Sequence, residues 1–240
     1  MDTIVIIQAR MGSSRLPGKV LKPLGSNDTL TYVVERCKLI EGVDTVIVAT
    51  SKLAQDDAIY DWCKSKGVNC YRGSEEDVLE RFIDISELYK PKYLVRVTAD
   101  CPFIDFKMAS EMISLIKKEN VEIIDVDDPL PRGIVSEVFS GELLQKIAVS
   151  VKEARHREHV TYFAYEYPHV FTRKTYNVSG ILKGKDFRIT LDTLEDYKML
   201  SHLAEHFNDI TVSIEEVVKY LIEHPEIAQI NAHIEQKPVV

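Results

Sequence analysis

Basic side chains and glycines gather in a short segment that directly follows the first apolar segment of the chain. This segment is Arg10-Met11-Gly12-Ser13-Ser14-Arg15-Leu16-Pro17-Gly18-Lys19. Glycines let the backbone approach an anion closely, and free backbone N–H groups bind phosphate oxygens. Residues 3–27 contain no acidic side chain and four basic ones, Arg10, Arg15, Lys19 and Lys22. The segment predicts a polyphosphate-binding loop, with a solvated basic loop as the alternative.

The two common phosphate-binding motifs do not account for this loop. A Walker A loop has four residues between its glycines and a Ser or Thr after its lysine. Here five residues separate Gly12 from Gly18, and Val20 follows Lys19. The dinucleotide fingerprint G-x-G-x-x-G is absent after this apolar segment as well. The loop therefore predicts a phosphate site of a different kind.

A carboxylate stands at the end of each of two later apolar segments. Asp100 lies in Thr98-Ala99-Asp100-Cys101-Pro102, and Asp192 ends Arg188-Ile189-Thr190-Leu191-Asp192. Mg²⁺ is usually held by one or two carboxylates together with substrate phosphates. With the basic loop, the two aspartates predict a site for a nucleotide and Mg²⁺. Taken singly, each aspartate is more simply a turn or helix-cap residue, and Asp192 could cap a helix that begins at Leu194.

Apolar segments rich in β-branched residues alternate with segments of helical periodicity over residues 1–125. Such runs indicate buried strands of a parallel sheet, and the alternation indicates helices on both faces of that sheet. The predicted strands are 3–7, 45–49, 68–71, 93–97, 121–124 and 187–191. Helices are predicted at 30–40, 56–66, after a Ser74 cap with Asp77 in the capping-box position, and at 108–118, 194–207 and 214–224. The pattern predicts an α/β fold, a three-layer sandwich around a mostly parallel, Rossmann-like sheet.

The regular alternation breaks between residues 126 and 186, where prolines and glycines are frequent. We interpret 126–186 as an excursion from one domain that spans residues 1–240, and not as a second domain. The segment after Pro225 is expected to be partly ordered at most.

The composition excludes several classes of protein. The chain has 240 residues, 45% of them hydrophobic, and a net charge of −8. An acidic chain is a poor partner for nucleic-acid polymers and for anionic membranes. No run is long enough to span a bilayer, and the N-terminus lacks a basic signal-peptide region. The four cysteines form no C-x-x-C pair, which favours a reduced, cytoplasmic setting.

One metal motif is judged to be accidental. His202-Leu203-Ala204-Glu205-His206 matches the H-x-x-E-H pattern of some zinc proteases. Few residues follow it that could supply a third ligand, and nothing else in the chain indicates a protease. A solvated amphipathic helix is the preferred interpretation.

Taken together, these segments resemble a known family. The run Gln8-Ala9 followed by residues 10–19 is similar to the opening motif of the sugar-acid cytidylyltransferases, the Kdo and acylneuraminate synthetases, and above all to their SpsF-like spore-coat polysaccharide branch. Later segments agree in order: Arg72-Gly73-Ser74, Asp77-Val78-Leu79, residues 98–102, Arg157-Glu158-His159-Val160-Thr161 and residues 188–192. The resemblance covers nearly the whole chain.

The resemblance implies a nucleotide-diphospho-sugar transferase (GT-A-like) fold and a homodimer formed through the mid-chain excursion. It implies that a sugar hydroxyl attacks the α-phosphorus of CTP and that pyrophosphate leaves, in the biosynthesis of a surface polysaccharide. The residues implied for the nucleotide are Arg10, Gly12, Ser13, Ser14, Arg15 and Lys19, with Arg72 and Asp77 near the nucleoside. Asp100 and Asp192 would hold Mg²⁺, and Lys19, Arg15 and Asp100 would be catalytic. Arg157, His159 and Arg188 would face an acceptor, plausibly an anionic sugar.

The chain departs from the family pattern at two positions, of which the first concerns the acceptor and the activity. The SpsF-like pattern Gly-Leu-Asp-Val-Glu is here Gly133-Ile134-Val135-Ser136-Glu137, so Val135 replaces the aspartate. Gln8 stands where the synthetases usually have proline. A glycosyltransferase that uses a nucleotide-sugar is one alternative, and Asp125-Val126-Asp127 would be its acidic pair, although Asp128-Pro129 after it indicates a turn. A non-catalytic nucleotide-binding protein is the other alternative.

Overall fold

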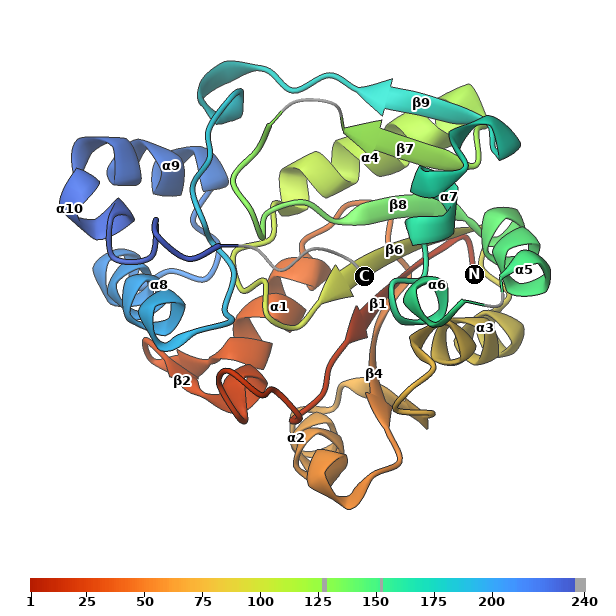
Figure 1. Cartoon of the computed structure of the whole chain (residues 1–240), viewed down its shortest axis with the longest axis horizontal. Helices are drawn as coiled ribbons and strands as arrows, with labels where there is room; N and C mark the ends of the chain where they lie inside the picture. The colour runs from red at the N-terminus through yellow and green to blue at the C-terminus, as the bar shows by residue number, and fades with distance from the viewer. Residues whose placement is uncertain (127–128, 152, 236–240) are drawn as a thin grey trace.

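The computed structural model describes residues 1–126, 129–151 and 153–235. Within these residues, seven strands form one sheet in the order β5-β4-β1-β6-β8-β7-β9 (Figure 1). Strands β5, β4, β1 and β6 are parallel, whereas β8 runs antiparallel to both β6 and β7. The strands are β1 (Thr3–Gln8), β4 (Thr45–Ser51), β5 (Asn69–Gly73), β6 (Tyr93–Thr98), β7 (Ile123–Val126), β8 (Glu137–Ser140) and β9 (Arg173–Tyr176). The predicted mostly parallel α/β sheet is confirmed.

The apolar core lies on both faces of this sheet because successive side chains of a strand point in opposite directions. In β1, Val5 and Ile7 join the core on one face, and Ile4 and Ile6 join the core on the other. The helices α1 (Thr29–Lys38), α4 (Phe106–Glu119), α8 (Leu194–Phe207) and α9 (Ile214–Glu223) cover the first face, and α3 (Val78–Tyr89) and α5 (Gly141–Ser150) cover the second. A continuous apolar run is thus explained by burial on two sides.

The remaining elements are short. They comprise a hairpin of β2 (Pro23–Leu24) and β3 (Asn27–Asp28), the helices α2 (Asp57–Lys66), α6 (Ala154–Glu158), α7 (Tyr162–Glu166) and α10 (Pro225–Ala228), and the 3₁₀ turns η1 (Lys19–Leu21), η2 (Ala54–Asp56), η3 (Pro168–Val170) and η4 (Gly180–Leu182). In the part of the chain described here, no helix is both long and apolar enough to cross a membrane.

Helix α3 begins three residues later than the sequence predicts. Asp77, not Ser74, is its N-cap, and the Asp77 side chain accepts a hydrogen bond from the Glu80 amide at 2.8 Å. The Ser74 hydroxyl instead accepts from the Asp77 amide at 3.2 Å. Serine and aspartate are both favoured at N-caps. The capping-box spacing is compatible with a helix that begins after Ser74 and with one that begins after Asp77.

The segment 126–186 returns twice to the main sheet. Strand β8 pairs with β6, and β9 pairs with β7, while α5 packs beside α3 (Figure 1). The strand predicted at 187–191 is wrong. Ile189 and Leu191 are buried and Phe187 is half-buried, but the stretch forms a single parallel bridge, between Arg132 and Arg188. Its backbone bonds to loop residues and not to a neighbouring strand.

Of the segment that begins at Pro225, which is expected to be partly ordered at most, the structure describes residues 225–235. These residues form α10 against α9, and the Asn231 side chain is 1% exposed. The side-chain amide of Asn231 donates to the Arg188 backbone carbonyl at 2.9 Å and to the Asp196 carboxylate at 2.8 Å. Asn231 therefore stabilises the segment that carries Asp192.

Candidate active site

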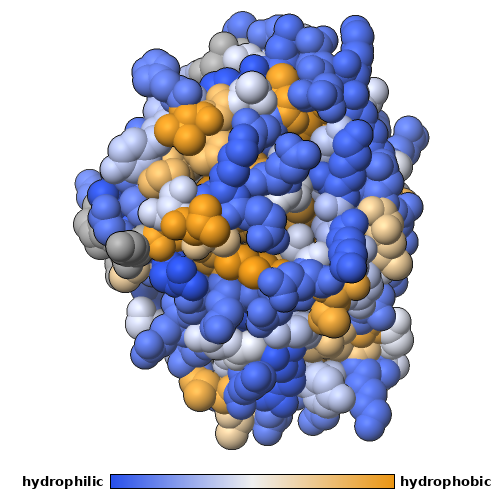
Figure 2. Space-filling view, turned by 90° about the vertical axis from the view of Figure 1, so that its right-hand side faces the viewer, coloured by the Kyte–Doolittle hydropathy of each residue, from blue (hydrophilic) through white to orange (hydrophobic). Residues whose placement is uncertain are grey.

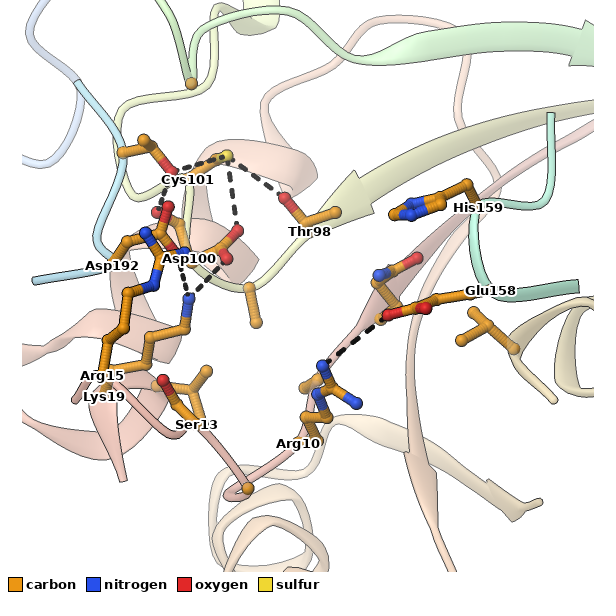
Figure 3. A pocket seen from close by; sticks show the side chains of 18 of the residues that line it. Arg10, Ser13, Arg15, Lys19, Thr98, Asp100, Cys101, Glu158, His159 and Asp192 are labelled. Carbon is orange, nitrogen blue, oxygen red and sulfur yellow. Dashed lines mark hydrogen bonds and ion pairs between the residues drawn. The ribbon is translucent and has the colours of Figure 1, made fainter. Parts of the chain in front are cut away.

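A cavity of about 710 Å³ opens where the parallel strands β1 and β6 end (Figure 3). This is the edge at which open α/β sheets bind ligands. Six separate parts of the chain supply its walls: the end of β1 with the loop after it, the start of α3, the end of β6 with the loop after it, the segment before β8, the end of α6, and the segment before α8. The lining residues are Gln8, Ala9, Arg10, Gly12, Ser13, Ser14, Arg15, Lys19, Val20, Val78, Arg81, Arg96, Thr98, Ala99, Asp100, Cys101, Arg132, Gly133, Glu158, His159, Thr190 and Asp192.

The loop after β1 is fixed by a carboxylate of η2, the 3₁₀ turn that follows β4. The buried Asp56 accepts a hydrogen bond from the Met11 amide at 2.7 Å, and Ser51 donates its hydroxyl to the same carboxylate. The Met11 carbonyl in turn accepts from the amides of Ser13 at 3.0 Å and Gly18 at 3.1 Å. Gly18 makes this turn with φ of 67°, a left-handed conformation that favours glycine.

This conformation leaves hydrogen-bond donors beside the cavity. Among the residues that the structure describes, the backbone amides of Gly12, Ser14 and Arg15 have no acceptor. All three residues line the cavity. Successive amides of this kind bind phosphate oxygens. The loop therefore offers the cavity three amide donors that the described residues leave unsatisfied, as an anion-binding loop would require.

Lys19 brings the two predicted aspartates together. Its Nζ lies 2.6 Å from Asp100 Oδ2 and 2.8 Å from Asp192 Oδ1, and Arg15 lies 3.0 Å from the same Asp192 oxygen (Figure 3). Burial would lower the pKa of Lys19, but the charges and hydrogen bonds of the two aspartates outweigh it and raise the pKa. Burial would likewise raise the pKa of Asp192, but Lys19, Arg15 and Arg188 lower it. Both shifts favour the charged forms of Lys19 and Asp192.

The loops that carry the aspartates are bonded to each other. The Asp100 carbonyl accepts hydrogen bonds from the Leu191 amide at 2.8 Å and from the Thr190 hydroxyl at 3.2 Å. Asp192 does not cap α8, because Thr193 is the N-cap and forms a capping box with Asp196. The Asp192 carboxylate is thus available to the cavity, and the helix-cap alternative for it does not hold.

Arg188 lies behind Asp192 and does not line the cavity. Its side chain is 7% exposed, and it donates to Asp192 Oδ2 at 2.8 Å and to Asp196 Oδ1 at 2.8 Å. These pairs form because Arg188 and Asp196 flank the start of α8. Arg188, which the resemblance implies for the acceptor, therefore orients Asp192 from behind the cavity wall.

Arg10, Glu158 and His159 lie on the opposite side of the cavity from Lys19 and the two aspartates (Figure 3). The Arg10 guanidinium is 3.9 Å from the Glu158 carboxylate. Burial lowers the pKa of His159, and Arg96 and Arg10 add to this effect against the opposing charge of Glu158. His159 is therefore neutral at pH 7, and this side of the cavity offers both hydrogen-bond donors and acceptors.

Arg96 is a lining residue that the sequence analysis did not select. Its Nε donates to Gln8 Oε1 at 3.0 Å, and its Nη1 donates to Glu137 Oε1 at 2.6 Å. Thr161 donates its hydroxyl to the other oxygen of Glu137. An arginine within an otherwise apolar strand was the available signal. Gln8, which departs from the family pattern, thus helps to hold a cation at the cavity.

Three other predicted site residues lie outside the lining. Arg72 pairs with Asp57 at 2.7 Å and donates to the carbonyls of Ser51 and Leu53. Arg157 forms an ion pair with Asp77, which links α6 to the start of α3. These contacts support the walls of the cavity from behind.

The other sequence features lie away from the cavity. Val135 is exposed and does not line it. Asp125 lies in β7 and pairs with Arg173 at 2.8 Å, whereas Asp127 and Asp128 lie outside the described residues. His202 hydrogen-bonds the Tyr220 hydroxyl at 2.8 Å, and the His206 ring stacks on the Tyr220 ring.

Comparison with known proteins identifies the family of the chain. A family model described as cytidylyltransferase matches residues 4–237. The spore coat polysaccharide biosynthesis protein SpsF of Bacillus subtilis is 34% identical over 95% of this chain and 97% of its own length. A cytidylyltransferase structure from Leptospira borgpetersenii is 31% identical and superposes with a TM-score of 0.90, covering 98% of this chain and all of that one.

A more distant structure shares the fold. It is a CMP:2-keto-3-deoxy-manno-octonic acid synthetase complexed with CTP, 16% identical, with a TM-score of 0.68 over 86% of this chain and all of that one. The phosphate-type loop, the paired aspartates at the sheet edge and the family match over nearly the whole length lead to one conclusion. The chain belongs to the cytidylyltransferase family of enzymes.

Proposed function

We propose that this protein transfers CMP from CTP to a sugar acid, or to a related sugar precursor, and releases pyrophosphate. The observation that carries the proposal is the single cavity that joins an anion-binding loop, a pair of aspartates and a separate polar wall. The names of the relatives support cytidine as the base and a role in surface polysaccharide biosynthesis.

The loop after β1 would bind the triphosphate. The free amides of Gly12, Ser14 and Arg15 and the cations Arg15 and Lys19 offer donors and positive charge to the cavity, and Arg10 adds positive charge from the side opposite Lys19. The Ser13 hydroxyl, which accepts from the Leu16 amide at 3.3 Å, lies in the same loop. Such preorganised donors stabilise charge that develops on transferred and leaving oxygens.

Asp100 and Asp192 would hold a divalent cation, Mg²⁺ in the proposed reaction. The donor set fits, because the two carboxylates already converge on one positive charge, the Lys19 ammonium. Phosphate oxygens usually complete the coordination of Mg²⁺. When bound, the metal would neutralise charge on the triphosphate and on the leaving pyrophosphate. Arg188 and Asp196 keep the Asp192 carboxylate in place for this role.

The acceptor would lie against the side of the cavity formed by Arg10, Arg96, Glu158 and His159. Its hydroxyl would attack the α-phosphorus from this side, opposite the leaving pyrophosphate. Arginines suit a carboxylate, and Glu158 with neutral His159 suits sugar hydroxyls. In this arrangement Arg96 replaces Arg157 and Arg188 as the proposed contact for an anionic acceptor.

We also propose that two copies of the chain associate through the segment 141–171. This segment carries the exposed apolar residues Val149, Tyr165, Tyr167 and Val170. Figure 2 views the side of the molecule on which α3 and α5 lie and shows apolar patches on a mainly hydrophilic surface. Light scattering of the purified chain would test this, and a monomeric mass would contradict it.

The reaction is tested by pyrophosphate release with each of the four nucleoside triphosphates and a panel of sugar acids. Release from CTP with one acceptor is expected. Transfer from a nucleotide-sugar without pyrophosphate would indicate a glycosyltransferase instead. CTP binding without turnover on any acceptor would favour a non-catalytic nucleotide-binding protein.

A further inference from the structure

Lys19 occupies the space between the two carboxylates that the proposed metal would need. Its Nζ is within hydrogen-bond distance of both Asp100 and Asp192, and its side chain is 12% exposed. We infer that Lys19 is an internal counter-ion of this pair, so that a divalent cation binds tightly only after the nucleotide has drawn Lys19 away. This inference rests on the proposed metal role of the two aspartates.

The charge balance of the pair supports this role. Asp192 also contacts Arg15 at 3.0 Å and Arg188 at 2.8 Å, so it keeps two cationic partners without Lys19. Asp100 has no other ion pair in the described part of the chain, and its remaining side-chain contact is the Cys101 thiol at 3.6 Å. A divalent cation that entered beside the ammonium would meet its like charge at short range. Lys19 therefore competes with a metal chiefly for Asp100.

The loop provides an alternative position for the ammonium. Lys19 directly follows Gly18 at the end of the loop whose amides line the cavity, and its side chain is a flexible four-carbon stem. A bound triphosphate would give the ammonium new anionic partners and would add oxygen ligands for the metal. Nucleotide binding would thus release Asp100 and create the metal site in one step. The structure predicts that nucleotide binds before metal.

Manganese binding to the full chain without acceptor tests this order, with free Mn²⁺ measured by electron paramagnetic resonance. The free wild-type protein should bind Mn²⁺ weakly, and CTP should strengthen binding. Lys19→Met should bind Mn²⁺ without nucleotide about tenfold more tightly than wild type, a factor that corresponds to ~1.4 kcal/mol. Lys19→Arg, which keeps the charge, should resemble wild type.

Lys52→Met is the matched control, because Lys52 is exposed and does not line the cavity. It should bind Mn²⁺ as wild type does. Circular dichroism melting of each variant checks that it is folded, and adding Asp100→Asn to Lys19→Met should remove the gain.

Two results would overturn the inference in different ways. If wild type binds Mn²⁺ with CTP but Lys19→Met gains nothing without it, Lys19 does not compete with the metal, and the proposed function stands. If no variant binds Mn²⁺ even with CTP, the proposed metal role of the aspartates fails as well.

Discussion

The backbone carbonyl of Asp100 accepts a hydrogen bond from the Leu191 amide at 2.8 Å. This bond joins the loop after β6 to the segment before α8, and each of these carries one aspartate of the pair. The separation of the two carboxylates is therefore fixed by the backbone as well as by Lys19. Removing one carboxylate charge should change the chemistry of the site and leave its framework in place.

We expect Asp100→Asn to lower turnover by at least about 10²-fold, the scale on which single electrostatic groups act in active sites. The amide cannot supply the negative charge that the proposed metal needs. Pyrophosphate release under saturating CTP is the measurement. Asp186→Asn is the control, because Asp186 is exposed and outside the cavity, and it should retain wild-type turnover. Equal rates for the two variants would remove Asp100 from the mechanism.

Asp192 should contribute stability that depends on pH in a defined direction. Burial would raise its pKa, but Lys19, Arg15 and Arg188 lower it below the ordinary value of 3.8. Because the unfolded chain then binds this proton more readily than the folded one, the stabilisation is complete above about pH 4 and is lost as the pH falls through the lowered pKa.

Urea denaturation of wild type and Asp192→Asn at several pH values would measure this contribution. We expect the variant to be less stable by about 3 kcal/mol at pH 7, as for loss of one partner of a buried pair, with the difference shrinking at acid pH. A difference that stays constant from pH 7 to pH 3 would contradict the assigned pKa direction.

Gly133 should be far less tolerant of a side chain than Gly184. Both have positive φ, 92° and 70°. A Cβ on Gly133 would lie 2.4 Å from the Ile189 carbonyl oxygen, whereas a Cβ on Gly184 would meet nothing within 4 Å. We expect Gly184→Ala to cost about 1 kcal/mol, from the backbone conformation alone. Gly133→Ala should cost at least about 2 kcal/mol more because of overpacking. Urea denaturation compares them, and equal losses would refute the close approach.

The cysteines should differ in their reactivity toward iodoacetamide. Burial raises the pKa of Cys101 to about 12 and also raises that of Cys37. A hydrogen bond with Cys63 lowers the pKa of Cys70, which is partly exposed. At pH 8 we expect Cys70 to be alkylated before the other cysteines. Peptide mass spectrometry over time would measure the order of modification. Modification of Cys101 at the same rate in the folded protein would show that its thiol is not shielded as described.

The sequence predicted the parts of the site that lie at strand ends. Strand β1 is a continuous apolar run, and the basic loop follows it directly, so its position at the sheet edge could be deduced. The same reasoning placed Asp100 after β6. The pattern at 187–191 correctly indicated burial, but it could not show that these amides bond to loop carbonyls such as those of Asp100 and Arg132.

Contacts between residues that lie far apart in the sequence could not be predicted in this way. Arg96 faces Glu137 because β8 runs antiparallel to β6, a pairing that the single sequence does not reveal. Arg188 was placed in the acceptor site because its motif matches the family, whereas the geometry of the α8 start turns it toward Asp196. Asn231, a lone polar residue in an unpatterned segment, gave no signal at all.

The bonds of Asn231 to Arg188 and Asp196 have a consequence for protein synthesis. A ribosome must translate the chain through Asn231 before the second aspartate of the site is held in place. A nascent chain that has been released only as far as Asp100 presents the basic loop and Asp100, but neither Asp192 nor the residues that orient it. Activity would therefore require translation through Asn231, and fragments that stop before it would lack a complete site.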